Sequence, residues 1–191
     1  MSEQDLSKNE IERRARLKAS RIRMIRNTFI WLLVVAAIAG AGYWVVMYSK
    51  KAESNKPGEA IAELGRNHIA VGAEHEQYNS NPPTSGSHYE QWAKWGIYEQ
   101  QLPDEQLIHN LEHGGIWISY KDKDNREIFD QLKDVAEDYS IKIILTHRPE
   151  NDSPIAVAAW TRLLKMDNFD EKQIRNFIKA FINKGPEQVP F

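Results

Sequence analysis

The chain has 191 residues, with 25 lysines and arginines against 27 aspartates and glutamates, and no cysteine. The lack of cysteine excludes disulfide frameworks, thiolate zinc sites, iron–sulfur clusters and cysteine nucleophiles. The net charge of -2 argues against nucleic-acid binding as the main function. An aromatic content of 10% favours a packed core over disorder.

An uncharged apolar run of 21 residues, Thr28–Tyr48, is the first clear feature of the chain. As a helix it would be about 31 Å long, enough for a hydrocarbon core of about 30 Å. Trp31, Tyr43 and Trp44 lie toward its ends, where aromatic rings favour the membrane interface. We therefore predict a transmembrane helix at 28–48.

The charges that flank this run predict its orientation. Seven basic residues and no acidic residue lie between Arg13 and Arg26, and fewer basic residues follow the run. The positive-inside rule then places the N-terminus in the cytoplasm and the residues from about 50 onward outside. A cleaved signal peptide is the alternative, but its apolar region is normally shorter. We expect an uncleaved, single-pass anchor in the cell membrane.

Four parts follow from this division: a cytoplasmic basic tail at 1–27, the transmembrane helix at 28–48, a linker at 49–65 and an extracytoplasmic domain at 66–191. The tail carries a net charge of +4, and the rest of the chain carries -6. The outer domain is therefore mildly acidic, and we expect no nucleic-acid partner for it.

The outer domain opens with a long segment, from Arg66 to about Leu107, that is rich in aromatic residues but has no regular period. Loops of this length tend to be functional when they are ordered. The elements predicted after it are a strand at 116–120, a helix at 125–139, strands at 141–146 and 155–160, and a helix at 170–183. This order predicts an α+β fold, a small mixed sheet with helices packed on one face, built from a β-α-β crossover followed by a hairpin.

The sharpest chemical signal is the sequence HNLEHGG, which places His109 and His113 four residues apart. On a helical turn these two rings project from the same face and can chelate one metal ion, as in the HExxH motif. Glu112 directly precedes the second histidine, so we expect it to point away from the shared face. It would then not serve as the base that HExxH supplies. The alternative is that both rings only satisfy backbone groups of the loop segment.

A second histidine, His88, ends the stretch YNSNPPTSGSH, in which two prolines stiffen the backbone. The alternative is a turn that packs on Trp92 and Trp95 and leaves His88 exposed. The hydroxyl groups of this stretch lack a GxSxG context, so serine–histidine catalysis is not favoured.

PPTSGxH, the stretch WAKWGIY and HNLEHGG together resemble the bacterial and archaeal family called domain of unknown function 3105, from about Gly65 to Phe177. The resemblance implies an N-terminal anchor or export signal followed by a histidine-bearing domain. Many relatives carry proline where this chain has Ser87, so the turn here is looser. The positions that fall in the family's motif pattern are His68, His88, His109 and His113.

Combining the motifs, we predict that His88, His109 and His113 share one metal ion, with His68 as a fourth ligand or a neighbour of the ligands. Histidine ligation without thiolates suits Cu(II), Zn(II) or Ni(II) and disfavours Ca(II) and Mg(II). Copper is the favoured metal and zinc the next. Met166 could add a thioether ligand, although its apolar surroundings favour a place in the core.

His75, between two glutamates, and His147, before a proline, are expected to be solvated or structural rather than ligating.

The leading hypothesis is a membrane-anchored extracytoplasmic protein that binds a transition metal for homeostasis or delivery, with the metal ion and another envelope protein as partners. The first alternative is a metal-dependent enzyme of the envelope, in which Glu112 or Asp104 acts as an acid or base. The second is a metal-free module that binds proteins or glycans through an aromatic groove formed by Trp92, Trp95 and Trp117.

Overall fold

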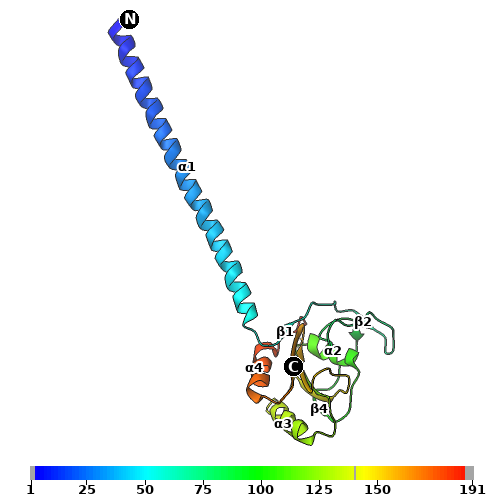
Figure 1. Ribbon diagram of the computed structural model, residues 1–191. Coiled ribbons are helices and arrows are strands. Elements are labelled where there is room, and N and C mark those ends of the chain that lie inside the picture. The colour runs from blue at the N-terminus through cyan, green and yellow to red at the C-terminus, as the bar shows by residue number, and fades with distance from the viewer. Residues whose placement is uncertain (1–2, 140, 188–191) are drawn as a thin grey trace. The chain divides into compact units, whose positions relative to one another are not determined.

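The computed structural model describes residues 3–139 and 141–187. It comprises two units, one that ends at Asn55 and one that begins at Lys56. The first is a single long helix, drawn from blue to cyan in Figure 1, and the second is an α+β domain. Each unit is described by itself below.

Helix α1 (Glu3–Ser54) has 52 residues and contains the whole apolar run. An 18-residue window within it reaches a mean hydropathy of 2.2. In the part of the chain that the structure describes, α1 is the one helix long and apolar enough to cross a membrane. This agrees with the predicted single-pass anchor. The helix continues to Ser54, so the first residues of the predicted linker are helical.

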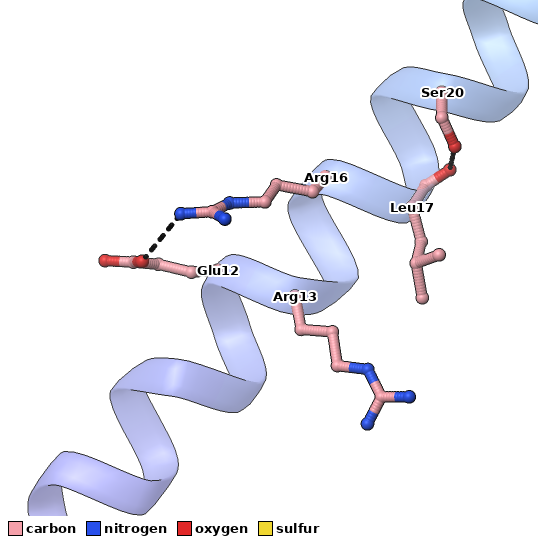
Figure 2. Close-up of a pocket in the computed structure, with 5 residues that line it drawn as sticks. All are labelled: Glu12, Arg13, Arg16, Leu17 and Ser20. Atoms are coloured by element: carbon pink, nitrogen blue, oxygen red, sulfur yellow. Dashed lines mark hydrogen bonds and ion pairs between the residues drawn. The ribbon is translucent and has the colours of Figure 1, made fainter.

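The basic stretch that precedes the apolar run is also helical. Figure 2 shows its side chains, including an ion pair of 3.6 Å between Arg16 and Glu12, one helical turn apart. Ser20 Oγ donates a hydrogen bond of 2.9 Å to the carbonyl of Leu17. The hollow between these side chains is lined by this one helix, so it is a feature of the helix surface rather than an enclosed cavity.

Six strands of the domain form one mixed sheet in the order β1-β8-β7-β5-β6-β4. Their bounds are β1 (Glu59–Ala60), β4 (Gly96–Tyr98), β5 (Ile116–Tyr120), β6 (Ile143–His147), β7 (Ile155–Ala159) and β8 (Arg162–Met166). Strands β5 and β6 are parallel neighbours joined through helix α3 (Arg126–Glu137), which confirms the predicted β-α-β crossover. Strand β1 pairs with β8, so two residues of the predicted linker belong to the sheet.

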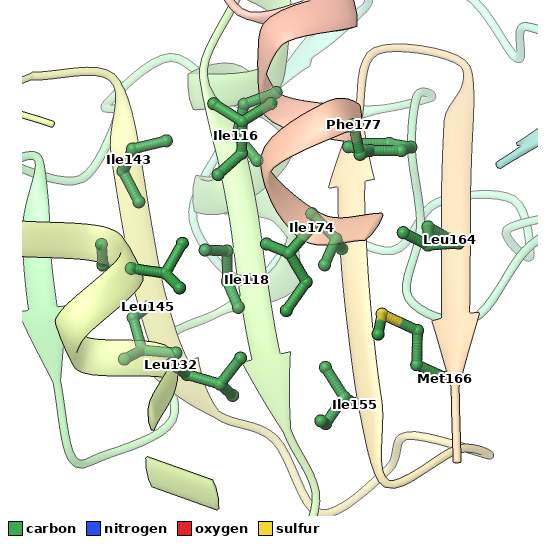
Figure 3. Close-up of a cluster of buried hydrophobic side chains, with 14 of the residues drawn as sticks. Ile116, Ile118, Leu132, Ile143, Leu145, Ile155, Leu164, Met166, Ile174 and Phe177 are labelled. Atoms are coloured by element: carbon green, nitrogen blue, oxygen red, sulfur yellow. The ribbon is translucent and has the colours of Figure 1, made fainter. Parts of the chain in front are cut away.

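One face of the sheet packs against α3 and α4 (Glu171–Phe181), as predicted. Ile116 and Ile118 from alternate positions of β5 meet Leu132 of α3 and Phe177 of α4 in a buried cluster, shown in Figure 3. The helices begin at side-chain caps: the Asn125 side chain accepts from the N–H of Ile128, and that of Asp170 from the N–H of Gln173.

The opposite face is covered by helix α2 (Asp104–Glu112) together with part of the loop segment. Trp117, which lies between Ile116 and Ile118 in sequence, points to this face and packs with Leu107 and Leu111 of α2. Alternating side chains of β5 therefore supply both cores of the domain. Because α2 rests on this second core, the histidines that it carries are held against a rigid support.

The predicted hairpin between the strands at 141–146 and 155–160 is wrong. Strand β7 pairs with β5 on one side and with β8 on the other, and both pairings are antiparallel. Strand β8 was not predicted, because the β7–β8 turn lacks the usual Gly or Asn. Thr161 takes the left-handed backbone there, with φ of 57°.

Candidate metal centre

Helix α2 positions His109 and His113 at its C-terminal end. Asp104 and Glu105 occupy its first turn, where negative charge is favourable, and Leu107, Ile108 and Leu111 bury its inner face. The helix ends at Glu112, and Gly114 takes a φ of 75° that favours glycine. The Nε2 atoms of His109 and His113 lie 3.0 Å apart, so the two rings meet as predicted from their spacing.

His88 and His68 are brought together by a short pair of parallel strands, β2 (His68–Ile69) and β3 (His88–Tyr89). The register places His68 opposite His88, and side chains in register on neighbouring strands point to the same face. Their ring centroids are 4.8 Å apart, and His88 is fully buried. The alternative in which His88 is exposed is therefore wrong.

Two of the buried rings have one nitrogen fixed by a backbone carbonyl. His88 Nδ1 lies 2.8 Å from the oxygen of Gly86, and His109 Nδ1 lies 2.7 Å from the oxygen of Tyr89. A carbonyl oxygen only accepts hydrogen bonds, so each Nδ1 carries the hydrogen and each neutral ring presents a lone pair at Nε2. This is the arrangement in which metal-binding histidines are oriented by a hydrogen bond behind the ring.

The ring nitrogens form two overlapping groups of donor atoms. His68, His88 and His109 offer donors that all lie within 4.8 Å of one another, and His109, His113 and Glu187 do the same. Two nitrogens that share one ion at about 2.1 Å each are separated by at most about 4.2 Å. Small rotations of the exposed His68 side chain would bring the first group into that range. The donor set could therefore hold a metal ion.

Glu112 lies among the histidines, which corrects the expectation that it points away. Its Oε2 is 3.0 Å from Nε2 of His88 and 3.8 Å from Nε2 of His68, and its side chain is only 5% exposed. It follows His109 by three residues, which is a rotation of about 60° short of a full turn. The spacing of three residues from His109 could have predicted that Glu112 lies near the histidines. The prediction was wrong because it considered only that Glu112 is adjacent to His113.

Burial lowers the pKa of His88 and of His113, because the apolar surroundings disfavour the charged ring. The neighbouring His109 lowers both pKa values further. The neutral form of both rings is therefore favoured at pH 7. His113 Nδ1 is buried and has no hydrogen-bond partner among the residues that the structure describes, which is unusual for a buried polar atom.

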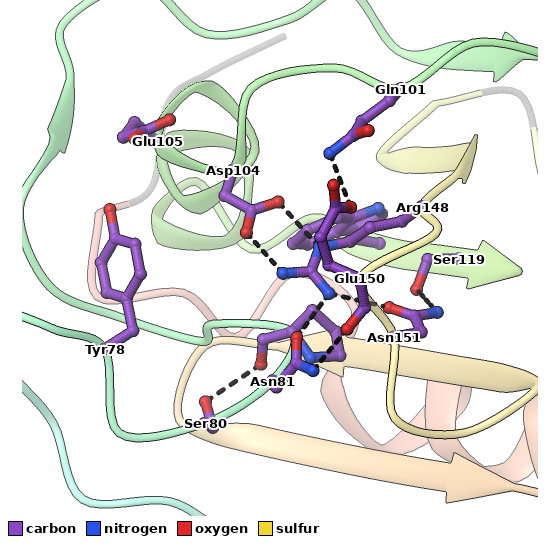
Figure 4. Close-up of polar contacts among 12 residues, drawn as sticks. Tyr78, Ser80, Asn81, Gln101, Asp104, Glu105, Ser119, Arg148, Glu150 and Asn151 are labelled. Carbon is purple, nitrogen blue, oxygen red and sulfur yellow. Dashed lines mark hydrogen bonds and ion pairs between the residues drawn. The ribbon is translucent and has the colours of Figure 1, made fainter. Parts of the chain in front are cut away.

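The two segments that carry the histidines are tied together by Arg148, at the end of β6. Its guanidinium donates two hydrogen bonds to Asp104, of 2.9 and 2.6 Å, at the start of α2. It also donates to the side-chain oxygens of Asn81, in the loop that leads to His88, and of Asn151. Figure 4 shows these bonds converging on one buried guanidinium. Asp104 thus pairs with Arg148, at the end of α2 away from the histidines.

The other predicted residues lie outside the cluster. Met166 is buried in the core beneath α4, so it offers no thioether to the site. His147 contacts the carbonyl of Lys121, and His75 contacts Glu105 and the carbonyl of Glu76.

The aromatic groove expected from three tryptophans is not formed as predicted. Trp117 is buried and donates a hydrogen bond of 2.8 Å to Oγ1 of Thr146 in the core. Trp92 and Trp95 lie side by side, but only Trp92 is well exposed, and its ring meets the edge of His113. Of the three tryptophans, Trp92 therefore borders the histidine cluster, and Trp117 belongs to the core.

Residues 70–190 match a family model described as "Protein of unknown function (DUF3105)". The match covers more than half of the chain, so the chain belongs to this family, as its motifs predicted. No curated protein and no solved structure matches the chain.

Proposed function

We propose that this member of the DUF3105 family is a membrane-anchored protein whose outer domain binds one transition-metal ion for homeostasis or delivery. His68, His88, His109 and His113 are the proposed ligands, and the anchor is α1, with the N-terminus in the cytoplasm. The basic residues before the apolar run support this orientation.

The fixed tautomers of the buried rings are the observation that carries this proposal. A histidine network that serves only the fold needs donors and acceptors in matched pairs. Here Nδ1 of His88 is taken by the carbonyl of Gly86 and Nε2 faces the carboxylate of Glu112 at 3.0 Å, so this buried contact needs either a proton between the two groups or a metal ion beside them. A metal ion satisfies both groups, and it also accounts for their burial.

Copper is the proposed metal and zinc the next. Imidazole nitrogens suit both ions, and Cu(II) binds such sites most tightly among the divalent first-row metals. The carboxylate of Glu112 adds a hard oxygen donor, which favours Cu(II) over Cu(I).

The test measures metal in the full-length protein, purified in detergent without a tag, by elemental mass spectrometry before and after addition of Cu(II) or Zn(II). We expect about one equivalent per chain. A triple variant with alanine at His88, His109 and His113 should lose it. The matched control replaces His75 and His147, which lie outside the cluster, and should retain the metal. Retention by the folded triple variant would refute the proposal.

A metal-dependent enzyme is the second candidate, and the position of Glu112 favours it. A buried carboxylate beside a histidine-ligated ion can accept a proton from an activated water. The metal-loaded protein should then hydrolyse ester or phosphoester probes, and Glu112→Gln should lower turnover while metal is retained. Absence of turnover across such probes would leave the binding function as the better account.

A further inference from the structure

The two groups of donor atoms share His109. One group joins it to His68 and His88, and the other joins it to His113 and Glu187. Its Nδ1 is held by the carbonyl of Tyr89, so His109 offers only Nε2 to an ion. The two groups therefore cannot each use His109 at the same time.

The second group depends on the segment that follows α4, which is closely fitted to the end of α2. The N–H of Asn183 donates to the carbonyl of Gly114 at 2.8 Å, and the N–H of Glu187 donates to the carbonyl of Glu112 at 3.1 Å. A Cβ on Gly185 would overlap the carbonyl oxygen of Glu112, so only glycine fits there. These contacts hold the Glu187 carboxylate 3.4 Å from Nε2 of His113.

The cluster has two exposed ends and a buried middle. His88, His109 and His113 are buried, whereas the side chain of His68 is 45% exposed and that of Glu187 is 51% exposed. The donors thus run from solvent at His68, through the buried rings, to solvent at Glu187. The side chains of His68 and Glu187 are therefore the donors that an arriving ion would meet first.

The Glu187 end differs from the His68 end in offering a carboxylate among its donor atoms. Arg66 lies at the His68 end, with Nε 4.0 Å from Glu112 Oε1 and 3.7 Å from Glu63 Oε1, so these two carboxylates offset its positive charge. At the other end the half-exposed carboxylate of Glu187, 3.4 Å from Nε2 of His113, attracts a cation and can also bind it. The Glu187 end therefore offers an arriving metal ion a charged ligand that is open to solvent.

On the basis of the proposed metal-binding function, we propose that His113 and Glu187, with His109, form an outer position through which a divalent transition-metal ion is taken up and released. His109 would stay bound through Nε2 while His68 and His88 replace His113 and Glu187, and the set of His68, His88 and His109 would form the inner position. The ion's charge and oxidation state do not change in this exchange. The inner position sets the affinity, and the outer position sets the rates.

The experiment follows Cu(II) binding to the full-length protein in detergent, with glycine present as a competitor, by stopped-flow quenching of tryptophan fluorescence. Release is followed after addition of excess chelator. Glu187→Gln should slow both uptake and release about 10-fold and change Kd by less than about twofold. The matched control is Glu127→Gln, the same charge change at an exposed position of α3, and it should leave both rates unchanged. His88→Asn should instead raise Kd.

The outcomes separate this inference from the proposed function. A folded wild-type protein that binds no copper would refute metal binding itself. Binding that is intact, with rates unchanged in Glu187→Gln, would refute only the outer position. A rise in Kd in Glu187→Gln as large as that in His88→Asn would show a single position in which Glu187 is an ordinary ligand. Two copper ions bound at once, both lost with His109, would also overturn the exchange.

Discussion

Replacing Arg148 tests whether the buried guanidinium holds the two histidine-bearing segments together. Arg148→Met keeps much of the side-chain volume but removes both hydrogen bonds to Asp104 and those to Asn81 and Asn151. The Arg148 side chain is 6% exposed and that of Asp104 is 20% exposed. Removal of one partner of a buried ion pair costs about 3–5 kcal/mol, mainly because the other charge stays behind.

Partial exposure of Asp104 lets water replace some of the lost hydrogen bonds, so we expect the lower end of that range, about 3 kcal/mol. For a domain of this size the loss corresponds to a fall in Tm of about 10 °C. The Cu(II) Kd of the folded fraction should also rise, because Asn81 leads to the loop of His88 and Asp104 begins the helix of His109.

The assay is thermal unfolding of the full-length protein followed by tryptophan fluorescence, because the Arg148 guanidinium lies 5.7 Å from the ring centroid of the buried Trp117. Arg148→Lys keeps the charge but loses the paired geometry, and its stability should fall between the wild type and Arg148→Met. A Tm of Arg148→Met within about 2 °C of wild type would contradict the reasoning. So would an unchanged Kd in a variant that is clearly destabilised.

Three further predictions concern pH and packing. Burial lowers the pKa of His88 and His113 below 6.5, so at acidic pH the unfolded chain binds more protons than the folded one. The metal-free domain should therefore lose stability as pH falls below that value. Thermal melts at about pH 7.5 and about pH 5.5 should show the lower Tm at the acidic pH, and equal Tm values would contradict the lowered pKa values. Phe177→Ala should cost about 3–5 kcal/mol by leaving a cavity beneath α4, without changing the metal bound per folded chain, as denaturant titration and elemental analysis would show. Trp117→Phe should cost about 1–3 kcal/mol, because Thr146 Oγ1 stays buried without its donor; a loss below about 0.5 kcal/mol in denaturant titration would show that this hydrogen bond contributes little.

Local patterns in the sequence were enough to predict strands β5, β6 and β7 and helices α3 and α4. The alternation of Ile116, Ile118 and Tyr120 identified β5 and its inward face, and the helical spacing of apolar residues identified α3 and α4. The strand and helix predictions both depend on how often apolar residues recur along the chain, and backbone geometry sets that repeat at two residues for a strand and about 3.6 for a helix. Strand β8 was not predicted, because the left-handed backbone of the turn before it is adopted by Thr161 and not by the Gly or Asn that usually indicates such a turn.

The histidine pair of α2 could likewise be predicted, because residues four apart on a helix always share a face. The meeting of His68 with His88 could not, since it depends on the register of two short strands twenty positions apart. Glu187 reaches His113 only because the segment after α4 crosses the end of α2. Residue type and local spacing were thus enough to name the histidines as candidate ligands. Which side chains meet, including the two glutamates, depends on the tertiary structure, because distances across the fold come from long-range packing that no local pattern contains.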